Sequence, residues 1–230
     1  MPRNITKETS DSYPMRINKY LALKKISTRR GADELVVDKK VFINGSPAIL
    51  GSRVHEGDVV EIKKFKREKY LYYAYNKPVG VETDSPQKGL FPLGRLDKAS
   101  HGLMILTNDG RITDQLLNPK YFHEKEYVVK TKEKLRRNFK QKMEAGVNIE
   151  GYVTKKCRVT IVNYFTFRIT LTEGKKHQIR RMCSALFQEV ADLKRERVMN
   201  VILGNLKPGT LREIKGAELN AFLKNLGLTE

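Results

Sequence analysis

A run of basic residues divides the chain and limits what it can fold into. Residues 63–69 contain five lysines and arginines in seven positions. The aromatic stretch 70–75, which has the composition of a strand, follows at once. We therefore predict a basic linker at 63–69 between a small domain at 15–62 and a larger one at 70–230. The polar residues 1–14 are expected to form a disordered leader.

The charge of the chain points to nucleic acid. The 230 residues carry a formal net charge of +19, with a pI near 9.9. An excess of this size favours nucleic acid as the partner, with an anionic membrane surface second. No apolar run is long enough for a transmembrane helix, and residues 1–14 lack the apolar core of a signal peptide. We expect a cytoplasmic protein without a membrane partner.

The two cysteines give no sign of a metal site. Cys157 and Cys183 stand alone, without a second Cys or His at metal-ligand spacing. They are expected to be reduced packing residues, and no zinc site is predicted.

The N-terminal part alternates helix and strand patterns. Apolar residues three and four positions apart predict a helix at 16–23 and a second helix capped by Ser27. Strands are expected at 41–43 and 59–62, with a tight turn at 44–45. The basic residues expected to contact RNA from this part are Arg16, Lys19, Lys24, Arg29 and Arg30.

A lone carboxylate stands before a buried strand in the larger part. Asp97 ends the stretch Gly-Arg-Leu-Asp at 94–97, an apolar strand is predicted at 103–107, and a turn follows at 108–110. Taken alone, an Asp near a Gly is more often a turn residue or a helix cap than a catalytic group.

The rest of the larger part has mixed patterns. At 173–183, Gly174 turns the chain into a helix, and Arg180 and Arg181 lie beside its apolar face. Two such arginines are otherwise most often plain surface charge. The other expected elements are helices at 112–117, 135–145 and 218–226, and strands at 154–159 and 165–171.

These stretches together resemble a known family. Residues 94–97 and the following Gly-Leu-x-x-Leu-Thr-Asn resemble the catalytic motif of the RsuA family of bacterial ribosomal-RNA pseudouridine synthases. The segments 76–80, 123–127 and 173–183 resemble further family motifs in the same order, and 198–201 and 208–212 fit the closing strands of the family. The segments that look most like the large-subunit branch of RluF type are 123–127, 154–157, 168–171 and 180–183. The N-terminal part resembles the S4 RNA-binding domain.

The resemblance implies a fold class. It is α+β: a small S4-like α/β domain, plus a larger catalytic domain built on a mainly antiparallel mixed sheet with flanking helices.

The resemblance also implies a reaction and its residues. The reaction is the isomerisation of uridine to pseudouridine in a flipped-out base, with no cofactor and no metal. Asp97 would be the catalytic carboxylate, with Arg180 as the cation beside it. Tyr127 would lie against the uracil, and Arg95 would fill the space left by the flipped base. Further RNA contacts are expected from Lys77, Lys98 and Arg181.

Several alternatives stay open. The expected partner is structured RNA, 23S rRNA or a pre-ribosomal particle, bound by a monomer. A synthase acting on small-subunit rRNA or tRNA fits the same motifs. A non-catalytic S4-type RNA-binding or ribosome-assembly factor is the rival of another class, but such a protein would be expected to lack Asp97 or Arg180. A methyltransferase is disfavoured, because no Gly-rich loop follows an early strand.

Overall fold

The chain forms two separate units in the computed structural model, which describes residues 13–24, 26–63 and 69–228. The division falls between Lys69 and Tyr70. Most of the expected leader and linker, 1–12 and 64–68, lies outside the described residues.

The first unit packs two helices against short strands. Helices α1 (Ile17–Leu23) and α2 (Arg29–Val37) enclose a core with Leu21 and Val36 at its centre. The remaining elements are β1 (Met15–Arg16), which pairs with β4 (Arg53–Val54), and a sheet of order β3-β2-β5 from Ser46–Pro47, Val41–Ile43 and Val60–Ile62.

The predicted cap of the second helix is wrong by one residue. Thr28 is the N-cap, and its hydroxyl accepts a hydrogen bond from the backbone N–H of Gly31 at 2.9 Å. Ser27 is buried instead, and a Cβ at Gly31 would lie 2.5 Å from its hydroxyl oxygen. The glycine therefore makes room for a buried serine under the start of the helix.

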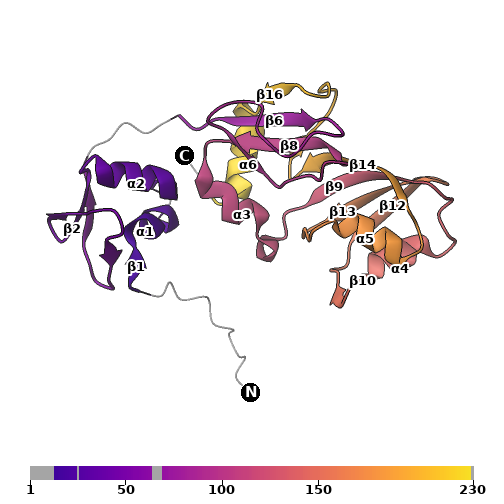
Figure 1. The fold of residues 1–230 in the computed structure, drawn as a ribbon, viewed down its shortest axis with the longest axis horizontal. Coiled ribbons are helices and arrows are strands. Elements are labelled where there is room, and N and C mark those ends of the chain that lie inside the picture. Colours follow the sequence, from indigo (N-terminus) through magenta and orange to yellow (C-terminus); the bar gives the residue numbers. More distant parts are fainter. Residues whose placement is uncertain (1–12, 25, 64–68, 229–230) are drawn as a thin grey trace, which may run out of the picture. The chain divides into compact units, whose positions relative to one another are not determined.

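A nine-stranded mixed sheet forms the second unit (Figure 1). Its main order is β12-β13-β9-β14-β8-β6-β16, while β15 pairs with β14 and β7 with β8. The pair β14–β8 is parallel, and the other pairs are antiparallel. The strands are β6 (Tyr72–Lys77), β7 (Phe91–Leu93), β8 (His101–Thr107), β9 (Lys125–Thr131), β12 (Arg158–Asn163), β13 (Thr166–Leu171), β14 (Val190–Val198), β15 (Val201–Ile202) and β16 (Leu211–Glu213). A separate hairpin pairs β10 (Asn148–Ile149) with β11 (Tyr152–Val153).

Apolar side chains gather into two main cores along this sheet. One joins β6 and β8 to α3 (Thr113–Leu117) and α6 (Gly216–Asn225). The other joins β9, β12 and β13 to α4 (Phe139–Ala145) and α5 (Gln178–Ala185). Short 3₁₀ turns at Gly110–Ile112 and Pro119–Tyr121 flank α3. The expected α+β class is confirmed.

Some expected elements differ from the structure. The helix expected at 135–145 begins only at Phe139, and the strand expected at 154–159 begins at Arg158. The strand expected at 198–201 is wrong, because Met199 and Asn200 form the turn between β14 and β15. Of the nine-residue strand β14, only Val198 was expected in a strand, although β14 pairs with three other strands. In the part of the chain that the structure describes, no helix could cross a membrane and no group of His, Cys, Asp and Glu could hold a metal ion.

Candidate active site

Asp97 lies in the loop between β7 and β8, with its carboxylate open to solvent. The side chain is 37% exposed, and its Oδ1 is 3.1 Å from Nε2 of His177. A turn follows Asp97 in the chain, in which the backbone N–H of Ser100 donates a hydrogen bond to the Asp97 carbonyl at 2.9 Å. A catalytic carboxylate is usually kept away from bulk water during the reaction, and because Asp97 is partly exposed here, bound substrate would have to exclude that water.

His177 is aimed at Asp97 by the start of α5. The residue has φ +52, in the left-handed region, directly before the helix. The buried carboxylate of Glu173 fixes this start, because it accepts hydrogen bonds from Nε2 of Gln178 at 2.8 Å and from the Tyr152 hydroxyl at 2.6 Å. The motif at 173–183 thus delivers an imidazole to the carboxylate.

Lys77 is buried beneath the Asp97 loop. Its ammonium donates to the carbonyls of Pro78 at 2.9 Å and Ser100 at 2.7 Å. Burial lowers the pKa of Lys77, and the charge of Asp97 opposes that shift. A lysine with no exposed surface cannot bind an RNA phosphate, so the predicted RNA contact of Lys77 is wrong. The residue instead supports the Asp97 loop and places positive charge near Asp97.

A buried arginine from β14 clamps both ends of the same loop. Arg195 is 2% exposed, and it donates from Nε to the Leu103 carbonyl and from a terminal nitrogen to the Gly94 carbonyl, each at 2.6 Å. Its charge also acts on buried Lys125, whose pKa is lowered to about 8 by burial first and by Arg195 second. The fork of one guanidinium thereby fixes the span of the loop.

Arg180 does not pair with Asp97 in the described structure. Its guanidinium donates to the carbonyls of Ala99 at 3.1 Å and Val190 at 3.4 Å, and to the Ser100 hydroxyl at 3.3 Å. The Asp97 carboxylate instead contacts Nε2 of His177, and Arg180 ties α5 to the Asp97 loop, so the role of Arg180 as a catalytic cation stays a prediction.

The other expected residues lie in varied surroundings. Tyr127 on β9 is half-buried and packs against the cluster that contains Leu96, the neighbour of Asp97. Arg95 and Lys98 are exposed on the loop. Arg181 turns away from it and donates to the Glu150 carboxylate at 2.7 Å.

Two site residues were missed from the sequence. His177 stood inside a recognised motif, but no periodicity indicates a left-handed residue before a helix. Arg195 lies in a strand rich in charged residues, which hides its inward direction. The parallel pairing of Arg195 with Gly102 is what brings this side chain to the loop.

Gly102→Ala tests how closely β14 must approach the loop. A Cβ at Gly102, which has φ +100, would lie 2.3 Å from the Arg195 carbonyl oxygen. We expect a loss of roughly 1–3 kcal/mol of unfolding free energy from strain and displaced backbone. Urea denaturation measures it, with Gly174→Ala as the control, because no atom lies within 4 Å of a Cβ there. Equal midpoints for the two variants would contradict the close packing.

Comparison with known proteins matches both units. Residues 71–185 match the RNA pseudouridylate synthase family, and residues 15–60 match the S4 domain. The dual-specificity RNA pseudouridine synthase RluF of Escherichia coli K12 is 40% identical over 228 residues, covering 91% of this chain and 79% of that protein. The ribosomal large subunit pseudouridine synthase B of Bacillus subtilis is 32% identical, covering 89% and 93%.

A solved structure agrees over nearly the whole length. A crystal structure of a pseudouridylate synthase aligns with a TM-score of 0.67 and 26% identity, covering 92% of this chain and 99% of the other. Sequence, fold and domain order thus lead to one assignment: the chain belongs to the RNA pseudouridylate synthase family and is an RNA pseudouridine synthase with an N-terminal S4 domain.

Proposed function

We propose that the chain converts a uridine of 23S ribosomal RNA to pseudouridine, with Asp97 as the catalytic carboxylate. The observation that carries the proposal is the loop of Asp97. Its carboxylate is partly exposed to solvent, while buried Lys77 and Arg195 hold the loop backbone through hydrogen bonds to its carbonyl groups. A carboxylate held this firmly can act at a fixed carbon atom of a bound nucleotide.

The proposed reaction balances without a cofactor. The bond from ribose C1′ to uracil N1 breaks, C1′ joins C5, the proton leaves C5, and N1 gains a proton. Asp97 would stabilise the separated intermediate, by a covalent bond or by its charge. Buried Lys77 would place positive charge near the carboxylate when substrate excludes water, and Nε2 of His177 lies 3.1 Å from its Oδ1.

The base must leave its stack before it can react. A uracil within a helix hides C5 and N1 from any side chain, so we propose that the target nucleotide is flipped out. Exposed Arg95, two positions before Asp97, would fill the gap in the RNA. Half-buried Tyr127 would lie against the uracil face.

The S4 unit would dock the surrounding RNA. Arg16, Lys24, Arg29 and Arg30 are exposed, Lys19 is half-buried, and none of these five forms an ion pair within the described residues. These cations, which lie on or directly beside helices α1 and α2, suit contacts to phosphates. We propose a cytoplasmic monomer, acting on rRNA or on a pre-ribosomal particle.

Mapping pseudouridine tests the proposal. We expect one or a few 23S positions to lose the modification in cells that lack this protein and to regain it when the protein is restored. The name of the Bacillus subtilis relative supports the large subunit. Loss of pseudouridine only in small-subunit rRNA or tRNA would show that the substrate is that RNA and not 23S rRNA. No loss in any RNA would favour a non-catalytic RNA-binding factor.

A further inference from the structure

Two exposed aromatic rings on the catalytic unit each carry a cation over one face. Tyr164 is 76% exposed, and the Lys134 ammonium lies 5.6 Å from its ring centroid. Phe187 is 74% exposed, and the Arg136 guanidinium carbon lies 4.9 Å from its ring centroid. Neither ring contributes to a buried core. We call these four residues the aromatic–basic edge.

Backbone hydrogen bonds hold the edge together although its parts are distant in sequence. The N–H of Leu135 donates to the Tyr164 carbonyl at 2.7 Å, which ties the segment after β9 to the turn between β12 and β13. The N–H of Lys132 donates to the Glu189 carbonyl at 2.9 Å, which ties the same segment to the residues after α5. The two rings are therefore presented by one fixed surface.

Phe187 occupies a position that does not favour an aromatic residue. It follows the C-cap Leu186 of α5 with φ +59, where glycine is usual because it lacks a Cβ. A bulky residue in this conformation costs stability, and here its ring covers no core. Strain of this kind, with no packing gain, indicates a use for the ring outside the fold.

The charge around the edge suits an anionic polymer. The exposed basic residues of the segment are Lys130, Lys132, Lys134, Arg136, Arg137 and Lys140. Of the two nearby carboxylates, Glu189 is paired with Lys132, and Glu133 accepts from the Glu189 backbone N–H at 3.2 Å. The surplus is positive, so a nucleic acid fits this edge better than an acidic or neutral peptide does.

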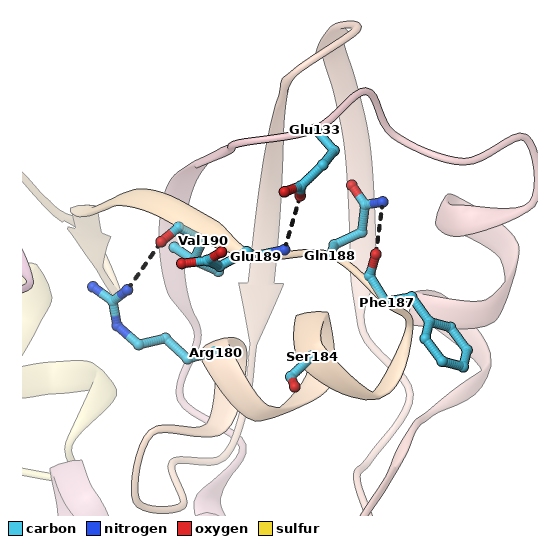
Figure 2. Close-up of a pocket in the computed structure, with 7 residues that line it drawn as sticks. All are labelled: Glu133, Arg180, Ser184, Phe187, Gln188, Glu189 and Val190. Carbon is cyan, nitrogen blue, oxygen red and sulfur yellow. Dashed lines mark hydrogen bonds between the residues drawn. The ribbon is translucent and has the colours of Figure 1, made fainter.

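An open hollow connects the edge to the active site. It has a volume of about 470 Å³, and its lining includes Phe187 and Arg180. Figure 2 shows the Phe187 ring at one end and the Arg180 guanidinium at the other. That guanidinium also contacts Ala99 and Ser100 of the Asp97 loop. The lining also contains Glu133 and Glu189 but not Tyr164. An RNA strand leaving the active site can thus follow the hollow as far as the Phe187 ring.

We propose that unpaired bases next to the target uridine stack on Phe187 and Tyr164. Base–aromatic stacking beside lysines and arginines is how proteins hold single-stranded RNA without reading its sequence. The aromatic–basic edge would keep the nucleotides next to the target uridine unpaired after that uridine has flipped out. This inference rests on the proposed action on structured RNA, and it assigns a surface separate from the S4 unit.

The test combines protein variants with altered RNA. Phe187→Gly relieves the backbone conformation, and Tyr164→Leu keeps apolar bulk without a flat ring. The probe is a fluorescent rRNA hairpin with the target uridine in its loop, either intact or with abasic flanking nucleotides. We expect each variant to weaken binding of intact RNA by about 5-fold or more. Abasic RNA should bind wild type and variants equally. Ile202→Ala, which removes a 56% exposed side chain on β15, is the control and should bind like wild type.

Three other outcomes would overturn the inference. Unchanged affinity of both variants for intact RNA would show that the rings do not touch it. An equal loss with intact and abasic RNA would show a contact to phosphate or a fold defect, and Phe187→Gly should unfold no earlier than wild type. Normal RNA binding with lost association to a ribosomal protein would make the edge a protein-docking surface. Wild type that binds the RNA but forms no pseudouridine would contradict the proposed function alone.

Discussion

Asp97→Asn is expected to abolish pseudouridine formation while RNA affinity stays within about twofold of wild type. The amide keeps the size and most hydrogen bonds of the carboxylate but has neither its charge nor its nucleophilic oxygen. We expect the single-turnover rate to fall by roughly 10³-fold or more, because the lost group acts in the chemical step. Binding rests mainly on phosphate contacts made elsewhere.

Stability should not account for this loss. The Asp97–His177 pair is partly exposed on both sides, and such pairs contribute little to folding. Asp114→Asn, which changes a 66% exposed carboxylate paired loosely with Lys120, is the matched control and should be fully active. The measurement is pseudouridine yield under single turnover, with binding and urea denaturation in parallel. Retained isomerisation by Asp97→Asn would refute the mechanism. Lost binding in a folded variant would make the loop an RNA contact instead.

Arg195→Met should damage both the fold and the reaction. The methionine fills much of the space but leaves the carbonyls of Gly94 and Leu103 without their donors. We expect a loss of about 2–4 kcal/mol in unfolding free energy, since buried polar groups lose their partners. The Asp97 loop should also lose its fixed span, so turnover should fall further than the unfolded fraction explains.

Two further variants distinguish the role of Arg195 in positioning the Asp97 loop from its contribution to the stability of the fold. Arg195→Lys keeps the charge but has no planar fork to reach both carbonyls, so it should fold better than the methionine variant and still turn over slowly. Arg197→Met, two positions along β14, removes a partly exposed arginine paired with Glu124. It should lower the unfolding free energy less than Arg195→Met does, and it should leave the single-turnover rate nearly unchanged. Single-turnover rates at a temperature where all variants are folded decide the matter. Wild-type rates for folded Arg195→Met would remove Arg195 from the positioning role.

The sequence predicts the apolar elements well and the charged ones poorly. Residues 103–107 indicate a strand because five apolar or β-branched residues enter a turn, and β8 covers them. Strand β14 has no such pattern, because its charged residues meet charged partners: Glu196 pairs with Arg168 on β13, and Arg197 pairs with Glu124 and Glu126. A strand stabilised by cross-strand ion pairs resembles a solvated loop when its partners are unknown.

The candidate active site likewise has a part that the local sequence indicates and a part that depends on tertiary structure. Asp97 could be proposed as the catalytic carboxylate from the sequence because its motif is contiguous, and that role stays a prediction. The side chain that contacts the Asp97 carboxylate could not be chosen from the sequence, since His177, Arg180 and Lys77 all lie in recognised motifs. The choice depends on how α5 begins, which the left-handed φ of His177 and the hydrogen bonds of buried Glu173 determine. These are tertiary features with no local pattern.

The parallel pairing of β8 with β14 also sets when the active site can first exist. The clamp between Arg195 and Leu103 joins residues 92 positions apart. A growing chain therefore carries Asp97 long before the strand that fixes its loop has been made. At synthesis rates of about 5–20 residues per second, the interval lasts several seconds. Catalysis thus waits for the last third of the chain, and a nascent chain that ends before β14 can display the motif without being an enzyme.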